Sequence, residues 1–198
     1  VILPQLSKHI KSKRKKKILL IQNKALELSL FLSLPASAAL IVGSEEIISA
    51  LFGYGSFDQL SALNSSKALF YFALGLPAFS LIKVFSSFFF ANHDTKIPFY
   101  ISLISVLVNI IISISYFGEN GFIIIPIATT ISSWLNALLL FIFLKNKSLF
   151  SFNDTFLINL IRISGTSLAM AIFFNFLMLY FQKELAFDQN IKSFYLIL

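Results

Sequence analysis

The chain has 198 residues, 57% of them hydrophobic and only 13% charged, with a mean hydropathy of +0.84. Soluble domains average about 25% charged residues, so this composition excludes an ordinary soluble domain and indicates an integral membrane protein. Cysteine is absent, which excludes disulfides, thiolate metal sites and cysteine nucleophiles, and the net charge of +7 does not indicate a nucleic-acid partner because seven of the sixteen basic residues are confined to residues 8–17.

The first 17 residues predict the end of one membrane span followed by a basic loop. Residues 1–6 are apolar and resemble the last turn of a helix, and residues 8–17 read as a solvated loop that sets membrane topology. The sequence has no initiator methionine and ends in an apolar run. We therefore expect it to be a piece of a longer protein, without a signal peptide at its start.

Five further apolar runs predict an all-α, polytopic bundle of transmembrane helices. A spanning helix needs about 20 residues, and each run reaches about that length. Residues 47–57 are too short to cross and are expected to form an interfacial or re-entrant piece, and a sixth span is expected to begin after a polar loop at 182–190. The five predicted spans are residues 18–42, 63–91, 97–117, 122–144 and 155–181.

The basic residues predict the orientation of these spans. The loops at 8–17, 91–96 and 145–154 contain ten lysines and arginines. The alternate loops, which include a predicted turn at 118–121, contain only Lys183 together with six acidic residues. Because basic loops stay on the cytoplasmic side, the first set is predicted to be cytoplasmic.

Three cations lie inside predicted spans: Lys67, Lys83 and Arg162. A lysine at mid-membrane costs about 3 kcal/mol on insertion scales, and intramembrane cations usually face the bundle interior or a wet cavity. Lys67 and Lys83 are 16 residues apart, which places them about 24 Å apart along a helix and about 160° apart around it, so they would serve different depths. The alternative is an internal salt bridge, for which Glu27 is the only intramembrane acid.

Polar residues also recur at helical spacing within the later spans. Small and hydroxyl residues at such positions can mediate helix packing, and they can equally line a polar cavity, so both interpretations stay open. Lys24 and Glu27 in the first span share a face and are expected either to neutralise each other or to reach such a cavity. The stripes are Ser102, Ser105, Asn109 and Ser113; Thr129, Ser132, Ser133 and Asn136; and Asn159, Arg162 and Thr166.

The sequence contains no signature of an enzyme or of a bound cofactor or metal. The two histidines, His9 and His93, fall in predicted loops, and the motifs of zinc proteases, serine hydrolases and P-loop proteins are missing. We therefore expect a transporter rather than an enzyme, without a cofactor.

Several short pieces, in order along the chain, carry a resemblance to a known family. They resemble the MurJ (MviN) family of lipid II flippases, within the wider group of multidrug, oligosaccharidyl-lipid and polysaccharide exporters. Asn109 and the sequence Lys67-Ala-Leu add to the resemblance, and residues 160–162 match it loosely. The main pieces are VILPQLS (1–7), LPA (34–36), LFGYGSF (51–57), ALGLPAFSLIKV (73–84), FFFANHDTKIP (88–98) and LNALL (135–139).

The resemblance implies a fourteen-span protein with two lobes around a central cavity. Residues 1–17 would be the end of span eight and a cytoplasmic loop, residues 18–145 the spans of the C-terminal lobe, and residues 146–198 additional C-terminal spans, the last of them cut short. It further implies a groove near the last two spans for a polyprenyl tail. The N-terminal lobe, whose arginines are expected to bind a diphosphate, would lie outside this chain and would be its partner.

The expected function is transport of lipid II, an undecaprenyl-diphosphate-linked muropeptide, across the bacterial inner membrane by alternating access. Membrane lipids are the other expected partners. Candidate diphosphate and cavity residues are Lys67, Lys83, Arg162, Asn109 and Asn136. The alternatives are a polysaccharide-lipid flippase or a multidrug or cation antiporter of the same superfamily, and, from other classes, a membrane-embedded glycolipid transferase or a non-transporting scaffold.

Overall fold

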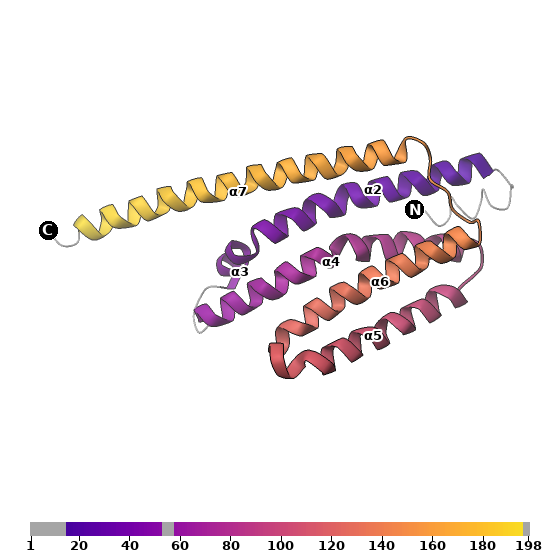
Figure 1. Cartoon of the computed structure of the whole chain (residues 1–198). Helices are drawn as coiled ribbons and strands as arrows, with labels where there is room; N and C mark the ends of the chain where they lie inside the picture. The colour runs from indigo at the N-terminus through magenta and orange to yellow at the C-terminus, as the bar shows by residue number, and fades with distance from the viewer. Residues whose placement is uncertain (1–14, 53–57, 196–198) are drawn as a thin grey trace.

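A computed structural model describes residues 15–52 and 58–195, with side chains described for 16–52, 58–119 and 121–180. Every element in these ranges is helical, and the long helices lie side by side (Figure 1). The predicted end of a preceding span and most of the basic loop at 8–17 fall outside the described residues. The elements are α2 (Lys15–Val42), α3 (Ser44–Phe52), α4 (Gln59–Ala91), α5 (Lys96–Asn120), η1 (Gly121–Ile123), α6 (Ile124–Asn146) and α7 (Phe156–Tyr195).

The five predicted spans are confirmed as helices. Helices α2, α4, α5, α6 and α7 each contain a stretch long and apolar enough to cross a membrane. Helix α4 begins earlier than predicted because Asp58 caps it, accepting a hydrogen bond from the Ser61 amide at 2.9 Å. Helix α3 has nine residues and is, as predicted, too short to cross, since it rises only about 14 Å.

Two predicted loops are wrong. The turn expected at 118–121 is shifted, because α5 stays helical through Asn120 and the chain reverses at Gly121, whose φ of 58° suits glycine. The polar loop expected at 182–190 is helical, and α7 runs unbroken to Tyr195. No glycine or proline interrupts residues 182–190, and glutamine, lysine, glutamate, leucine and alanine are all good helix formers, so polarity alone did not end the helix.

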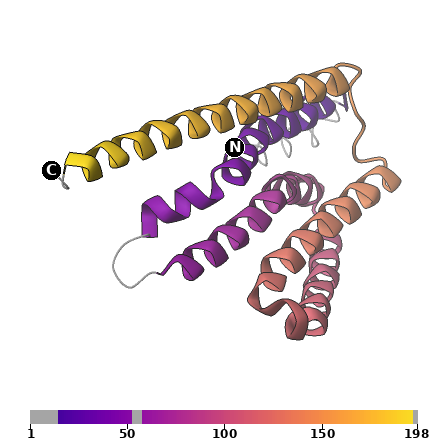
Figure 2. The same cartoon turned by 60° about the vertical axis from the view of Figure 1, so that its left-hand side comes forward.

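Helix α6 lies in the interior of the packed region. It contacts both α4 and α5, and α4 in turn contacts α2. Among the described helices, α7 contacts α2 alone, and both views show it running along the outside of the bundle (Figures 1 and 2). The molecule is therefore layered as α7, α2, α4, α6 and α5.

Helices α4 and α6 approach each other closely at Gly75. A Cβ built there would lie 3.0 Å from Thr130 Oγ1 and 3.1 Å from the Phe79 ring, so a larger residue would require these side chains to shift. The close approach lets Thr130 Oγ1 donate to the Tyr71 carbonyl at 2.6 Å and Trp134 Nε1 donate to the Leu74 carbonyl at 3.1 Å. Small residues at contacts and hydrogen bonds across them are how helices associate in a membrane.

Aromatic side chains fill the bundle near the C-terminal ends of α4 and α6. Phe88 is fully buried and stacks on Phe150, with ring centroids 5.9 Å apart, and Phe85 meets Phe88 edge to face. The stack continues through Phe152 to Phe156 at the start of α7. This phenylalanine cluster joins the ends of α4 and α6 to the linker that leads into α7.

Helices α4 and α6 end in the same way at this end of the bundle. His93 and Ser148 each adopt positive φ just past a helix, and the following amides, of Asp94 and Leu149, bond back to carbonyls five residues earlier. This is the Schellman arrangement that satisfies terminal carbonyls. A salt bridge of 2.7 Å from Lys147 Nζ to Asp94 Oδ2 then ties the two helix ends together.

Two buried amides of α2 fix the linker between α6 and α7. Gln22 donates to the Leu149 carbonyl at 3.0 Å. Asn23 donates to the Ser151 carbonyl at 2.9 Å and accepts from the Asn153 amide at 3.1 Å. The start of α7 is thereby held against α2.

Candidate functional site

Lys83 lines a groove between α2 and α4, which we call the lysine groove. Its volume is about 500 Å³. Hydroxyl groups of Ser29, Ser33 and Ser80 lie in the same groove, and Lys83 is exposed there with no ion pair in the part of the chain that the structure describes. The other lining residues are Ala25, Leu28, Leu32, Leu76, Phe79 and Val84.

Arg162 lines a second groove, between α2 and α7, which we call the arginine groove. Its volume is about 310 Å³, and Lys24, Glu27 and Asn159 line it as well. Glu27 Oε1 accepts a hydrogen bond from Asn159 Nδ2 at 3.0 Å. No ion pair joins Glu27 to Lys24 or to Arg162 among the described residues, so neither the predicted self-neutralising pair nor an internal salt bridge of Arg162 is formed.

Asn109 and Asn136 line a third groove, the asparagine groove, between α4, α5 and α6. Its volume is about 270 Å³. Asn109 Nδ2 donates to Thr129 Oγ1 at 3.1 Å and to Ser132 Oγ at 3.2 Å, whereas the buried Asn136 Oδ1 has no hydrogen-bond partner among the described residues. The predicted polar stripes of the third and fourth spans thus meet, and they both pack the helices and line a groove.

The three grooves lie in a row across one face of the molecule. Leu28 lines both the arginine and the lysine groove, and Phe79 lines both the lysine and the asparagine groove. These two side chains are therefore the ridges between adjacent grooves. We call this the grooved face, and it brings Lys83, Arg162, Asn109 and Asn136 onto one surface although not into one pocket.

Lys67 is not part of this arrangement. It is exposed on α4 and lines none of the three grooves. Because it lies 16 residues before Lys83 on the same continuous helix, it is about 24 Å away along the axis. The expectation that Lys67 and Lys83 serve different depths stays a prediction, and none of the three grooves gives Lys67 companion residues.

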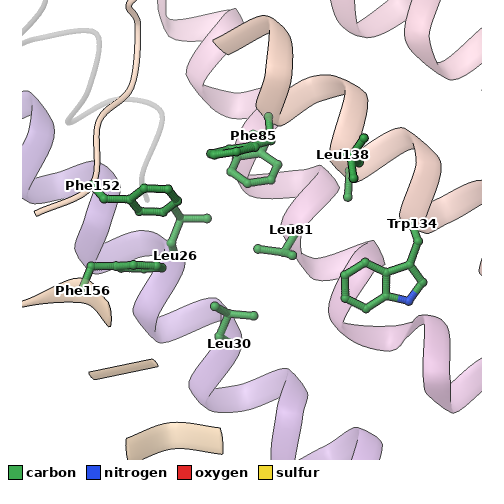
Figure 3. Close-up of a pocket in the computed structure, with 10 residues that line it drawn as sticks. Leu26, Leu30, Leu81, Phe85, Trp134, Leu138, Phe152 and Phe156 are labelled. Atoms are coloured by element: carbon green, nitrogen blue, oxygen red, sulfur yellow. The ribbon is translucent and has the colours of Figure 1, made fainter. Parts of the chain in front are cut away.

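A separate, wholly apolar groove opens on the other side of the α2–α4 pair (Figure 3). Its volume is about 240 Å³, and Leu26 and Leu30 of α2 line it, with Leu81 and Phe85 of α4 facing them. Leu26 and Leu30 are each two residues from Leu28, which puts them on the far side of α2 from the grooved face, since two residues turn a helix by about 200°. Phe152 and Phe156 border it at the start of α7.

Sequence reasoning missed the serines of the lysine groove. Ser29 and Ser33 are four residues apart on α2, and Ser80 and Lys83 are three apart on α4, so each pair shares a helix face. That spacing was available in the sequence, but nothing in it indicated that the two faces meet.

As for metals, the described residues hold no group of three or more histidines, cysteines and acids that could bind an ion.

Comparison with known proteins gives a consistent result. The family model described as "Lipid II flippase MurJ" matches residues 1–195. A probable lipid II flippase MurJ of Rhizobium meliloti (strain 1021) is 40% identical over 141 residues, covering 71% of this chain and 26% of that protein. The corresponding protein of Rhizobium tropici is 41% identical over 150 residues, covering 74% and 28%.

A solved structure described as "Lipid II flippase MurJ, inward closed conformation" has a similar fold. The TM-score is 0.72 at 29% sequence identity, and the match covers 87% of this chain and 35% of that one. The chain therefore spans only about a quarter to a third of the length of the proteins it matches.

Proposed function

The chain belongs to the MurJ family, and from this premise we propose that it forms much of the C-terminal lobe of a protein that moves lipid II across the bacterial inner membrane. The substrate is an undecaprenyl diphosphate that carries a muropeptide, and no covalent bond changes during transport. The N-terminal lobe of the same protein would close the cavity opposite the grooved face. The loops at 91–96 and 145–154, with the basic stretch at 8–17, would be cytoplasmic.

The observation that carries this proposal is the exposed, unpaired Lys83 inside a groove of a membrane-spanning helix pair. A cation there is costly, and in the described residues no acid offsets it. Arg162 lies in the adjacent groove, so two cations flank the Leu28 ridge. A diphosphate diester carries two negative charges, and lysine and arginine supply only donors and positive charge, with the arginine fork able to bind two oxygens.

Lys67 would act at a different stage of transport. Its position nearer the opposite end of α4 would offer the diphosphate a second cationic station after it leaves Lys83. Asn109 and Asn136 would contact uncharged polar parts of the headgroup from the asparagine groove. The apolar groove has a lining suited to a hydrocarbon chain, but it opens away from Lys83, so we do not assign the polyprenyl tail to it.

Family membership favours this function over the alternatives raised by the sequence. A polysaccharide-lipid flippase or an antiporter would be the nearest relatives in mechanism. A cation antiporter is expected to rely on buried carboxylates, and Glu27 is the one acid that lines the described grooves. A glycolipid transferase would need a catalytic acid or a metal cluster, for which the grooves offer no group of residues among those described.

Translocation of lipid-linked precursor in cells that carry single substitutions tests the proposal. Lys83→Ala and Arg162→Ala in the full-length protein should each reduce flux about tenfold or more, as expected for loss of a hydrogen bond to a charged group. Lys145→Ala is the matched control, because Lys145 is exposed in the last turn of α6 and outside the grooves. Unchanged flux in both groove variants would remove these residues from the transport path.

A further inference from the structure

The lysine groove contains an unpaired buried hydroxyl. Ser33 is only 6% exposed, and its Oγ has no hydrogen-bond partner among the described residues. Buried polar groups in proteins are satisfied in the great majority of cases, so this exception in the wall of a groove needs an explanation, and a ligand bound in the groove would supply the missing partner. Ser33 lies one helical turn beyond Ser29 on α2, on the side that faces α4.

A second donor comes from the pair formed by Ser29 and Ser80. Their Oγ atoms hydrogen-bond to each other across the helix interface. Each hydroxyl has a single hydrogen, so this contact uses one of the two and leaves the other. Where Ser80 keeps its hydrogen, the acceptor that the described residues offer it is the Ser29 carbonyl, a poor one at 3.4 Å from Ser80 Oγ.

We propose that Ser33, together with the Ser29–Ser80 pair, forms a hydroxyl cradle that binds the oxygens of a phosphate group whose charge is balanced by Lys83. This inference rests on the proposed function in that it names the groups that hold the substrate's anionic part. Anions suit the site because it presents hydroxyl donors and one ammonium group, and because no carboxylate lines it. The volume of about 500 Å³ leaves room for a diphosphate together with water.

The cradle gives a reason for the position of Lys83. An ammonium group alone is a compact, hydrated charge with no preferred geometry, so it attracts an anion without orienting it. Hydroxyls fixed on two helices add direction, and they lie where leucines and Phe79 reduce the access of water. Ser33 is therefore a positioning residue, and Lys83 supplies the charge.

Substitution of Ser33 by alanine distinguishes a residue that binds phosphate from a hydroxyl that is merely unsatisfied. If Ser33 Oγ were only an unsatisfied group, Ser33→Ala would leave the unliganded protein equally or more stable and would not alter ligand binding. If it binds phosphate, Ser33→Ala leaves the unliganded protein stable but weakens anion binding by about tenfold. Ser33→Thr keeps the hydroxyl and should restore most of the binding.

The experiment uses the full-length protein in phosphatidylcholine nanodiscs, with thermal stabilisation by ligand as the readout. The two probes are inorganic pyrophosphate and undecaprenyl diphosphate, which separate a free phosphate from a lipid headgroup. Ser87→Ala is the control, because Ser87 lies on the same helix as Ser80, bonds to its own helix at Val84 and is outside the groove. A probe that raises the unfolding temperature of the wild type should raise that of Ser87→Ala equally. It should raise that of Ser33→Ala much less.

The outcomes separate this inference from the proposed function. No stabilisation of the wild type by either probe, or equal stabilisation of wild type and Ser33→Ala, would overturn the cradle, even if Lys83→Ala stops lipid translocation. Weaker binding in Ser33→Ala with normal translocation in every groove variant would support the cradle and contradict the proposed role of Lys83 and Arg162 in transport.

Discussion

Helices α6 and α7 have similar hydropathy but very different surroundings. In the most apolar 18-residue stretch of α6, 44% of the residues are buried within the molecule, compared with 11% in the corresponding stretch of α7. Helix α6 is packed between α4 and α5, whereas α7, among the helices that the structure describes, touches only α2. Hydropathy alone therefore does not distinguish an interior helix of this bundle from a peripheral one.

The polar side chains of the two helices also have different partners. On α6, Thr130 and Trp134 donate to α4 and Thr129 and Ser132 accept from Asn109 of α5. On α7, Asn159 bonds to Glu27 of α2, and Arg162 forms no ion pair with any residue that the structure describes. The interior helices are joined by these hydrogen bonds, and the grooved face carries cations that form no ion pair among the described residues.

The largest expected effect comes from removing a phenylalanine in the packed region. Phe88→Ala should destabilise the protein by about 3–5 kcal/mol, because the side chain is fully buried between Phe85 and Phe150 and its loss leaves a cavity. Phe173→Ala on α7 is the matched change, at a side chain that is 62% exposed. It should alter stability by about 0.5 kcal/mol or less.

Thermal unfolding of the full-length protein in detergent micelles measures both substitutions. A large loss from Phe88→Ala with a small one from Phe173→Ala would support the contrast between the two regions. Equal losses would mean that α7 is packed as tightly as α6 in the complete protein, with the remainder of that protein covering Phe173.

A smaller effect is expected at the junction between the two regions. Asn23 is 3% exposed and connects α2 to the linker through the Ser151 carbonyl and the Asn153 amide. Asn23→Ala leaves both groups without their partner, which should cost about 1–3 kcal/mol of local stability. Hydrogen exchange of peptides that cover 147–155 should accelerate by about tenfold or more, since exchange follows local opening.

Leu20→Ala is the control for Asn23, because Leu20 lies on the same helix at a position that is exposed. It should leave exchange in the linker unchanged. Unaltered exchange in Asn23→Ala would show that the Gln22 hydrogen bond and the phenylalanine cluster hold the linker without Asn23.

The sequence predicted the helices well because each span is a long apolar run between polar breaks. The prediction failed where polar residues, taken as a loop, continue a helix. Residues 182–190 are polar but contain no breaker, and Gly118 is compatible with a helix while Gly121 makes the turn. The glycine requiring positive φ cannot be distinguished by composition from the one that does not.

The candidate site was predictable by residue type but not by arrangement. Lys83 and Arg162 stand out as charges in apolar runs, and the stripes of Asn109 and Asn136 follow from helical spacing. Their division among three adjacent grooves depends on how α2 packs against α4 and α7. These helices are far apart in the sequence, so spacing within one helix does not predict their contacts. Ser33 was missed for the same reason, since a serine is conspicuous only once burial shows that it lacks a partner.

The smallest expected effect concerns the salt bridge between the ends of α4 and α6. The side chains of Lys147 and Asp94 are 47% and 22% exposed, so solvent screens the pair and it should contribute about 0.2–1 kcal/mol. The Lys147 hydrogen bond, supported by the Ile97 amide, lowers the pKa of Asp94 below its ordinary value. Asp94 therefore contributes stability above the ordinary pKa of about 3.9, and this contribution is lost as pH falls through the lowered folded value.

Lys147→Ala tests this pair without removing the Asp94 contact to the Ile97 amide. Because the wild-type advantage requires an ionised Asp94, the stability difference between wild type and variant should be constant from about pH 6 to 8 and should shrink below about pH 4. It should also shrink in about 1 M salt, where the screening length falls to about 3 Å, and Lys145→Ala should show neither dependence. A difference that persists at acid pH would mean that Lys147 stabilises the end of α6 through the helix carbonyls rather than through Asp94. In that case the salt bridge would not link the ends of α4 and α6. It would then add nothing to the contrast in stability between the packed region and α7.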